Sequence, residues 1–240
     1  MKKIRLGVNI DHAATLRQAR GGTTTYPDLL QLTKLIKKAG AEQITIHLRE
    51  DRRHIQDHDV IRLTKDRLLE INLEMGATAE MQVIALKQKP NWVCLVPEKR
   101  QELTTEGGLD LLHRQDELKK YIAVLNKKNI LVSVFIDPDL EQVAVAADIG
   151  AQACEFHTGH WVSAKGKAKS QIWKKLVKAS DFAHANGMIV NAGHGLDFEH
   201  TKVIKKLPHL HEVNIGHSII CYSLVEGIES VIKKYIKILK

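Results

Sequence analysis

Two periods of hydrophobic and polar residues alternate along the whole chain. Alternation at every second residue, which is typical of strands, predicts eight strands at residues 4–10, 43–48, 70–75, 92–97, 132–137, 153–159, 188–193 and 212–217. Amphipathic patterns of helical period predict helices at residues 28–40, 58–68, 78–88, 112–128, 139–149, 168–186, 198–206 and 219–238. In the first of these helices, Asp28 is a plausible N-cap and Gly40 a plausible terminator.

Eight strand–helix units in 240 residues predict an α/β fold, a single (β/α)8 TIM barrel, because such barrels need roughly 250 residues. No linker or shift in composition interrupts the pattern, so one domain is expected over residues 1–240. A doubly wound open sheet is the structural alternative. Its glycine-rich GxGxxG turn is missing after the first strand.

Composition narrows the class of protein. A hydrophobic content of 44% excludes a disordered chain. No apolar run is long enough for a bilayer, and Asn9 and Asp11 interrupt the start before a signal-peptide core could form. Three cysteines without CxxC spacing indicate reduced thiols. We therefore expect a cytoplasmic protein without membrane contact.

The positive charge leaves two kinds of partner open. Lys and Arg outnumber Asp and Glu by 36 to 28, a net charge of +8, which favours anionic partners. Many lysines lie on predicted helices, where solvated faces are the simpler explanation, and aromatic residues make up only 5% of the chain. Small phosphorylated substrates therefore explain the charge better than nucleic acid does.

The strands place polar side chains inside the barrel. In residues 43–48, Ile44 and Ile46 share one face, and Thr45 and His47 share the other. Outer helices can cover only the apolar face, so the polar face must line the interior. Ordinary barrels fill that interior with Val, Ile and Leu, and an unpaired charge there costs several kcal/mol. A functional interior is therefore expected.

Chemically capable residues also fall at or just past the C-terminal ends of the predicted strands, the rim where barrel enzymes keep their chemistry. They are Asn9, Asp11, His47, Arg49, Glu74, Glu98, Asp137, His157, His194 and His217. Their joint placement on nearly all strands predicts an active site at this rim.

Four glycine-containing or basic loops are candidate anion sites. The loops after the last two strands, 191–196 and 214–218, carry Gly193, Gly195 and Gly216 and predict a phosphate cradle. The loop 47–54 holds four cationic side chains, which fit either a second anion site or a solvated run of charges. Residues 104–108 add hydroxyl and amide donors.

Several catalytic classes lack their motifs. No HExxH, Cys/His cluster or GxSxG occurs, and the first strand has no HxH. No lysine ends the strand at 153–159, where aldolases carry a Schiff base, although Lys99 is a weaker candidate. Proton transfer by His and Glu, without a metal, is the chemistry that remains.

Seven motifs together resemble one family. They are G-V-N-I-D-H (7–12), H-L-R-E-D-R-R-H (47–54), N-L-E-M (72–75), V-P-E-K-R-Q-E (96–102), T-T-E-G-G-L-D (104–110), N-A-G-H-G-L (191–196) and N-I-G-H (214–217). This set is similar to pyridoxine 5′-phosphate synthase. The resemblance implies a homo-octamer of (β/α)8 barrels that condenses 1-deoxy-D-xylulose 5-phosphate with 3-amino-2-oxopropyl phosphate. The products are pyridoxine 5′-phosphate, phosphate and water, and no metal or other cofactor takes part.

The resemblance also implies residue roles. His47 and Glu74 would accept protons, His194 would donate one, and Glu155 would stabilise a transition state. The amino-ketone phosphate would be held by Asn9, Gly195, Gly216 and His217. The sugar phosphate would be held by Asp11, His12, Arg49, His54 and Thr104, with Arg20 also contributing to the site. Another phosphosugar lyase or isomerase, or a basic nucleic-acid-binding module, are the alternative functions.

Overall fold

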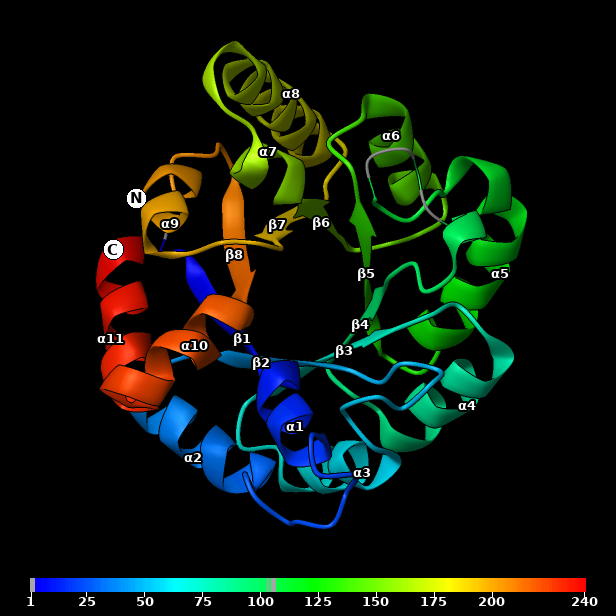
Figure 1. Ribbon diagram of the computed structural model, residues 1–240. Coiled ribbons are helices and arrows are strands. Elements are labelled where there is room, and N and C mark those ends of the chain that lie inside the picture. Colours follow the sequence, from blue (N-terminus) through cyan, green and yellow to red (C-terminus); the bar gives the residue numbers. More distant parts are fainter. Residues whose placement is uncertain (1–2, 103, 105–106) are drawn as a thin grey trace.

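The computed structural model describes residues 3–102, 104 and 107–240. A closed barrel of eight parallel strands forms its centre, each strand pairing with the next and β1 pairing with β8 (Figure 1). The strands are β1 (Arg5–Asn9), β2 (Gln43–His47), β3 (Glu70–Met75), β4 (Trp92–Leu95), β5 (Leu131–Ile136), β6 (Ala153–His157), β7 (Ile189–Gly193) and β8 (Leu210–Ile215). The predicted barrel is confirmed, and closure rules out the open-sheet alternative.

Helices surround the barrel, and α1, α7 and α10 lie inside this outer ring, over the barrel mouth (Figure 1). The helices are α1 (Asp11–Gln18), α2 (Leu29–Ala39), α3 (Asp57–Asp66), α4 (Ala79–Gln88), α5 (Gln115–Asn126), α6 (Leu140–Asp148), α7 (Gly159–Ser163), α8 (Gly166–Ala185), α9 (Phe198–Ile204), α10 (His217–Glu226) and α11 (Ile228–Leu239). Short 3-10 turns occupy Arg100–Glu102 and Leu112–Arg114. Within the described ranges, none of these helices combines the length and apolar character needed to cross a bilayer.

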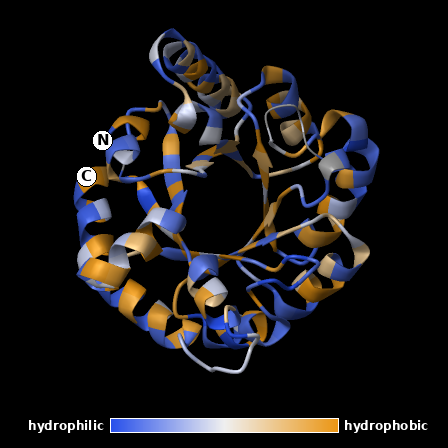
Figure 2. Ribbon diagram, in the orientation of Figure 1, coloured by the Kyte–Doolittle hydropathy of each residue, from blue (hydrophilic) through white to orange (hydrophobic). Residues whose placement is uncertain are grey.

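The two faces of the strands are used as predicted. Ile44 and Ile46 on β2 are fully buried in the apolar layer under the helices. Their neighbour Thr45 is also fully buried, but its hydroxyl hydrogen-bonds Asn214 of β8 inside the barrel. The outer helices carry alternating hydrophobic and hydrophilic bands, as expected when one side of each packs on the sheet (Figure 2).

Helix α2 begins and ends where its sequence predicts. The Asp28 side chain accepts hydrogen bonds from the backbone N–H groups of Leu30 and Gln31, which caps the first turn. The helix stops at Gly40, whose φ of 103° lies in the left-handed region.

Two other helix predictions need correction. The single helix expected at 219–238 is wrong, because Gly227, with φ 78° and ψ 145°, divides it into α10 and α11. Such backbone angles cannot continue a helix and suit glycine. Helices α1 and α7 were not predicted, since segments of 8 and 5 residues are too short to show a clear helical period. The strand expected at 153–159 is two residues shorter than predicted. It ends at His157, because the unpredicted helix α7 begins at Gly159.

Candidate active site

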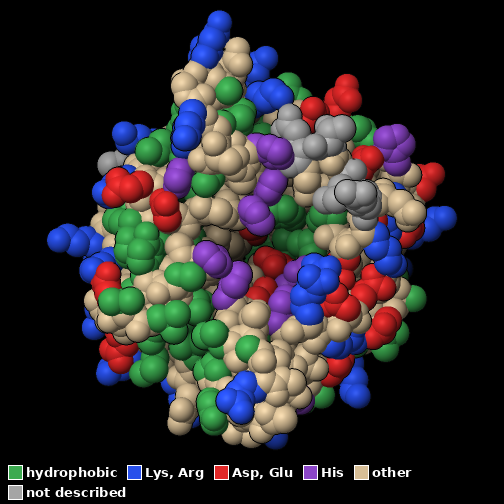
Figure 3. Space-filling model, in the orientation of Figure 1, with side chains coloured by type: hydrophobic (Ala, Val, Ile, Leu, Met, Phe, Trp, Pro, Cys, Tyr) green, Lys and Arg blue, Asp and Glu red, His purple; other side chains and the backbone are tan. Residues whose placement is uncertain are grey.

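The rim at the C-terminal ends of the strands gathers the predicted chemistry. Asn9 and His47 end β1 and β2, Glu74 is the second-last residue of β3, His157 ends β6, and His194 directly follows β7. Histidine side chains surround the hollow in the middle of this face, with Asp or Glu side chains inside it (Figure 3). The predicted position of these residues at one rim is therefore confirmed.

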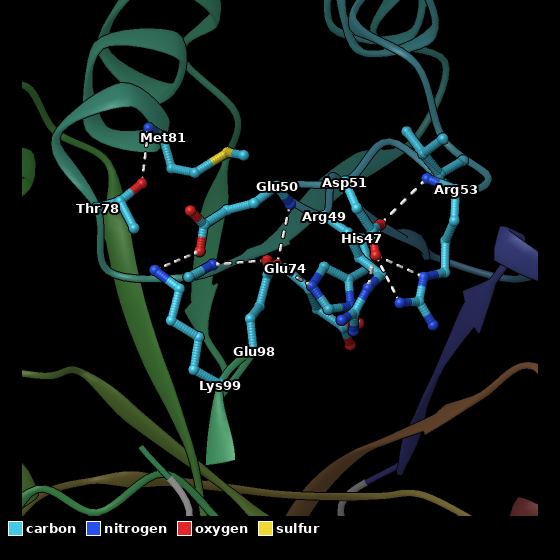
Figure 4. Close-up of polar contacts among 12 residues, drawn as sticks. His47, Arg49, Glu50, Asp51, Arg53, Glu74, Thr78, Met81, Glu98 and Lys99 are labelled. Atoms are coloured by element: carbon cyan, nitrogen blue, oxygen red, sulfur yellow. Dashed lines mark hydrogen bonds and ion pairs between the residues drawn. The ribbon is translucent and has the colours of Figure 1, made fainter. Parts of the chain in front are cut away.

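His47 lies between two carboxylates (Figure 4). Its Nε2 is 3.1 Å from Glu98 Oε1, and its Nδ1 is 3.9 Å from Glu74 Oε2. Glu98 is fixed in turn by the backbone N–H groups of Glu50, at 2.9 Å, and Gly76, at 3.2 Å. Burial opposes ionisation of Glu98, but its hydrogen bonds to His47 and Glu50 lower its pKa overall. Glu98 is therefore an anion that accepts a hydrogen bond from His47.

Asp11 joins the start of α1 to this group. Its carboxylate accepts hydrogen bonds from the Asn9 side chain and the His47 backbone N–H, both at 2.8 Å. Burial raises the pKa of Asp11 to about 6. Asp11 therefore couples the ends of β1 and β2, and its protonation changes near neutral pH.

The surroundings of the Glu74 carboxyl group disfavour its ionised form. Burial, and then the carboxylates of Asp11 and Glu155, raise its pKa well above the ordinary value. A raised pKa makes the ionised carboxylate a stronger base, which suits a residue proposed to accept protons in general acid–base catalysis.

Donor atoms of Asp11, His47 and Glu74 lie within 4.8 Å of one another, close enough to hold a metal ion. Among the described residues this is the group of three with such spacing. Two carboxylates and one imidazole could ligate a divalent cation. The same three side chains are also suited to proton transfer by their hydrogen bonds, so the predicted absence of a metal stays a prediction.

Glu155 lies deeper, inside the barrel. Its Oε2 accepts a hydrogen bond of 2.6 Å from Asn214 Nδ2 across the interior. Burial raises its pKa to about 7, although the Asn214 hydrogen bond acts in the opposite direction. A Cβ on Gly193 would lie 2.0 Å from Glu155 Oε1. Gly193, predicted to serve a phosphate cradle, is thus a glycine because Glu155 occupies that space.

The basic loop after β2 divides into two parts. Arg52 forms ion pairs with Asp57 and Glu80, and Arg53 pairs with Asp51 on the surface. Arg52 and Arg53 therefore match the second alternative predicted for this loop, a solvated run of charges.

Arg49 and His54 remain near the site. Arg49 favours the charged forms of Asp11 and Glu98, and the His54 ring centre is 6.1 Å from that of His47. Burial, followed by the charges of His47 and Arg49, lowers the pKa of His54 to about 4. His54 is therefore neutral at physiological pH.

Of the two loops predicted to bind phosphate, 214–218 lies against the end of β1, and 191–196 contacts the start of α10, where the Ser218 hydroxyl donates to the Leu196 carbonyl. The ring of His217, the first residue of α10, is 4.9 Å from the His12 ring. A Cβ on Gly216 would lie 2.8 Å from Asn9 Cβ, so these residues are in close contact. Gly195 follows His194 in the exposed turn after β7, where both have positive φ.

Two further predicted residues lie apart from the His47 group. Thr104 donates its hydroxyl hydrogen bond to Asp137, on the β5 side of the rim. The neighbouring positions 105 and 106 of the predicted donor loop lie outside the described residues. Arg20 is exposed in the turn after α1, and none of the contacts described for the chain joins its side chain to the other site residues.

Sequence reasoning placed Glu98, Asp137 and His157 at the rim but gave them no role. Their positions at strand ends were the available signal. A buried pair of Arg17 and Asp59 was missed altogether. The Arg17 guanidinium contacts both Asp59 oxygens, at 2.7 and 2.5 Å, and also donates to the His54 carbonyl at 3.3 Å. No sequence motif marks this pair.

An eight-stranded barrel with carboxylates and imidazoles gathered at its C-terminal rim has the architecture of the (β/α)8-barrel enzymes, which keep their active sites at this rim. Within this class, the chain belongs to the family described as Pyridoxal phosphate biosynthesis protein PdxJ, whose sequence profile matches residues 6–240. The family predicted from the motifs is therefore confirmed.

Two relatives of the chain share one enzyme name, pyridoxine 5′-phosphate synthase. A pyridoxine 5′-phosphate synthase of Bdellovibrio bacteriovorus is 57% identical over 238 residues, 99% of both chains. A pyridoxine 5′-phosphate synthase of Thioalkalivibrio sulfidiphilus is 50% identical over 231 residues, 96% of this chain and 93% of the relative.

Solved structures of other enzymes share the fold alone. Phosphoribosyl anthranilate isomerase from Thermus thermophilus matches with a TM-score of 0.61 at 12% identity, over 98% of both chains. KGPDC from Streptococcus mutans matches with a TM-score of 0.65 at 13% identity, over 99% of this chain and 98% of that one.

Proposed function

We propose that this chain is a pyridoxine 5′-phosphate synthase that condenses 1-deoxy-D-xylulose 5-phosphate with 3-amino-2-oxopropyl phosphate. The products are pyridoxine 5′-phosphate, inorganic phosphate and water. The observation that carries the proposal is His47 held between Glu74 and Glu98 at the mouth of a barrel that is 57% identical to a synthase of that name. The reaction joins an amine to a ketone, loses water and phosphate, and closes a ring, so it needs several proton transfers.

His47 is the first base in this proposal. Ionised Glu98 can only accept a hydrogen bond, so the His47 proton resides on Nε2. Nδ1 then carries the lone pair and faces Glu74. This tautomer leaves Nδ1 free to take a proton from the attacking amine, and Glu74 is positioned to pass protons on.

His194 is the acid of the scheme. Desolvation, followed by the neighbouring imidazoles of His157 and His160, lowers its pKa. A protonated imidazole with a lowered pKa releases its proton more readily, which suits the loss of water from a carbinolamine. Glu155, held by Asn214 beneath this point, would stabilise positive charge that develops during ring closure.

The two phosphorylated substrates are assigned to opposite groups of residues. The amino-ketone phosphate is held by Asn9, Gly195, Gly216 and His217, three of which meet where β1 approaches α10. The sugar phosphate is held by Asp11, His12, Arg49, His54 and Thr104, with Arg20 also contributing. Arg49 supplies a guanidinium that suits phosphate oxygens.

A homo-octamer in the cytoplasm, without nucleic-acid partners, is part of the proposal. Exposed apolar side chains on α10 and α1 support self-association, since Leu224 is 70%, Val225 89% and Leu16 48% exposed. Light scattering of the purified protein tests the octamer. A monomer at micromolar concentration would contradict it.

The activity is tested by mixing purified protein with both substrates in EDTA and following pyridoxine 5′-phosphate by absorbance and fluorescence. We expect product only when both substrates are present, and undiminished rates in EDTA. Turnover of one phosphosugar alone would favour another lyase or isomerase. Salt-sensitive, sequence-independent DNA binding without turnover would favour the basic binding module.

A further inference from the structure

A second pair of acid and imidazole lies on the β5–β6 side of the rim and has no role in the scheme above. His157 Nδ1 is 3.3 Å from Asp137 Oδ1. The two side chains are only 11% and 7% exposed. Asp137 directly follows β5 and His157 ends β6, so two adjacent strands fix the pair.

Asp137 acts as a permanent acceptor. Besides His157, its carboxylate accepts hydrogen bonds from the Thr104 hydroxyl and from the Gly108 backbone N–H, the latter at 3.0 Å. Burial opposes its ionisation, but these hydrogen bonds, that of His157 first, lower its pKa overall. An ionised Asp137 places the proton of neutral His157 on Nδ1, which leaves the lone pair on Nε2.

The His157 ring lies next to the His194 ring. The two ring centres are 4.9 Å apart, and the Phe135 ring lies 5.2 Å from His157 and 6.3 Å from His194. A Cβ on Gly159 would lie 2.8 Å from His157 Nε2 and 2.9 Å from His194 Cδ2. Both rings therefore lie against the same point over Gly159, and His157 packs beside the His194 ring.

We propose that Asp137 and His157 form a positioning pair that fixes the orientation of the His194 imidazole and controls how readily it carries a proton. Asp137 fixes the tautomer of His157, and His157 packs against His194. Because Asp137 also anchors Thr104, the same carboxylate links the proton donor to the sugar-phosphate group. The catalytic consequence rests on the proposed function, whereas the coupling of the two imidazoles does not.

Other ionisable groups around His194 are few. His160 of α7 lies next to His157, with ring centres 5.5 Å apart, and its charge also disfavours protonated His194. Glu155 of β6 lies under Gly193, the residue before His194. Asp137 of β5 acts through His157. Replacing His157 by a neutral amide removes the repulsion between the protonated forms of the His157 and His194 rings, which raises the pKa of His194.

The test is a histidine NMR titration of the purified protein, with the His194 signal assigned by its loss in His194→Gln. We expect His157→Gln to raise the pKa of His194 by roughly 0.5–1 unit. The alkaline limb of the kcat profile, where activity is lost as His194 loses its proton, should move to higher pH by the same amount, with KM for both substrates nearly unchanged. Asp137→Asn should move the same limb and also raise KM for the sugar phosphate about tenfold, because the amide offers one acceptor oxygen where His157, Thr104 and Gly108 use two.

His113 provides the matched control. Its Nδ1 lies 2.5 Å from Asp110, but its side chain is 84% exposed on the outer surface. His113→Gln should leave the His194 titration and the kcat profile unchanged. An unchanged His194 titration in folded His157→Gln would overturn the proposal, as would a loss of thermal stability with no change in either pH profile.

Two further measurements separate failure of this proposal from misfolding of a variant and from failure of the proposed function. Should His157→Gln fail to fold, the titration is made in His157→Asn and Asp137→Asn, and an unshifted His194 in both refutes the pair. Should the wild-type protein make no pyridoxine 5′-phosphate, the proposed function fails. The NMR titration still decides whether His157 controls His194.

Discussion

The buried ion pair between Arg17 and Asp59 offers the clearest test of how the site is held. Arg17 of α1 is 6% exposed and Asp59 of α3 is 2% exposed. The guanidinium forms two short hydrogen bonds to the carboxylate and a third to the His54 carbonyl. Replacing Arg17 with Met keeps an unbranched apolar stem but removes the guanidinium and leaves the Asp59 charge buried.

The expected loss follows from that uncompensated charge. Removing one partner of a buried pair costs about 3–5 kcal/mol, because the remaining ion has lost its counterion but not its burial. Asp59 keeps a hydrogen bond from the Gln56 backbone N–H at 2.9 Å, which favours the lower end of this range. In a domain of this size, the melting temperature should fall by roughly 6–20 °C.

Urea unfolding at matched protein concentration measures the loss, with Arg17→Met/Asp59→Asn as the control. The double variant buries no charge, so we expect it to recover most of the stability. Both variants lose the donor to His54, so both should raise KM for the sugar phosphate more than they lower kcat. A loss below 1 kcal/mol in Arg17→Met, or a double variant as unstable as the single one, would refute this reasoning.

Three shorter predictions follow from the site and the barrel interior. Glu74→Gln should lower kcat by about 10²–10⁴-fold with the fold intact by circular dichroism, and near-normal turnover would exclude Glu74 as a base. Burial raises the pKa of Glu212 to about 8 from an ordinary 4.5, so folding is favoured most below about pH 4.5 and this contribution is lost as pH rises through about 8. Denaturant unfolding of Glu212→Gln across this window should therefore show a flatter pH dependence, and a curve parallel to that of the wild type would contradict it. Gly193→Ala should displace Glu155 and abolish activity, whereas Gly187→Ala, with nothing within 4 Å of the added Cβ, should cost only about 1–2 kcal/mol for its positive φ and keep activity.

The fold was predictable because strands and long helices carry their own periodicity. All eight strands were found, and α2 was bounded by its cap and terminating glycine. Short elements were not found, since α1 has only 8 residues and α7 only 5, little more than two turns at most. These two helices lie over the barrel mouth, so the missed elements are the ones nearest the site (Figure 1).

The sequence indicated which residues belong to the site but not which of them contact one another. Position at a strand end selected His47 and Glu98, yet only the closed barrel brings these residues, 51 apart in sequence, to 3.1 Å. The same holds for Arg17 and Asp59, which are 42 residues apart. Contacts of this kind depend on the tilt and register of the barrel, which local sequence does not encode.

The polar interior shows how pairing makes an unusual core stable. Asn214 of β8 donates to Glu155 on β6 and accepts from Thr45 on β2, so a single amide links three strands. Gln43 continues the chain of hydrogen bonds to Glu212. Each buried polar group left unpaired would cost about 1–3 kcal/mol, so these residues are stable inside the barrel only as a connected set. A connected set also fixes Glu155 in place. The alternation of the strands predicted that the interior is polar, and the hydrogen bonds show that its polarity supports the rim from below.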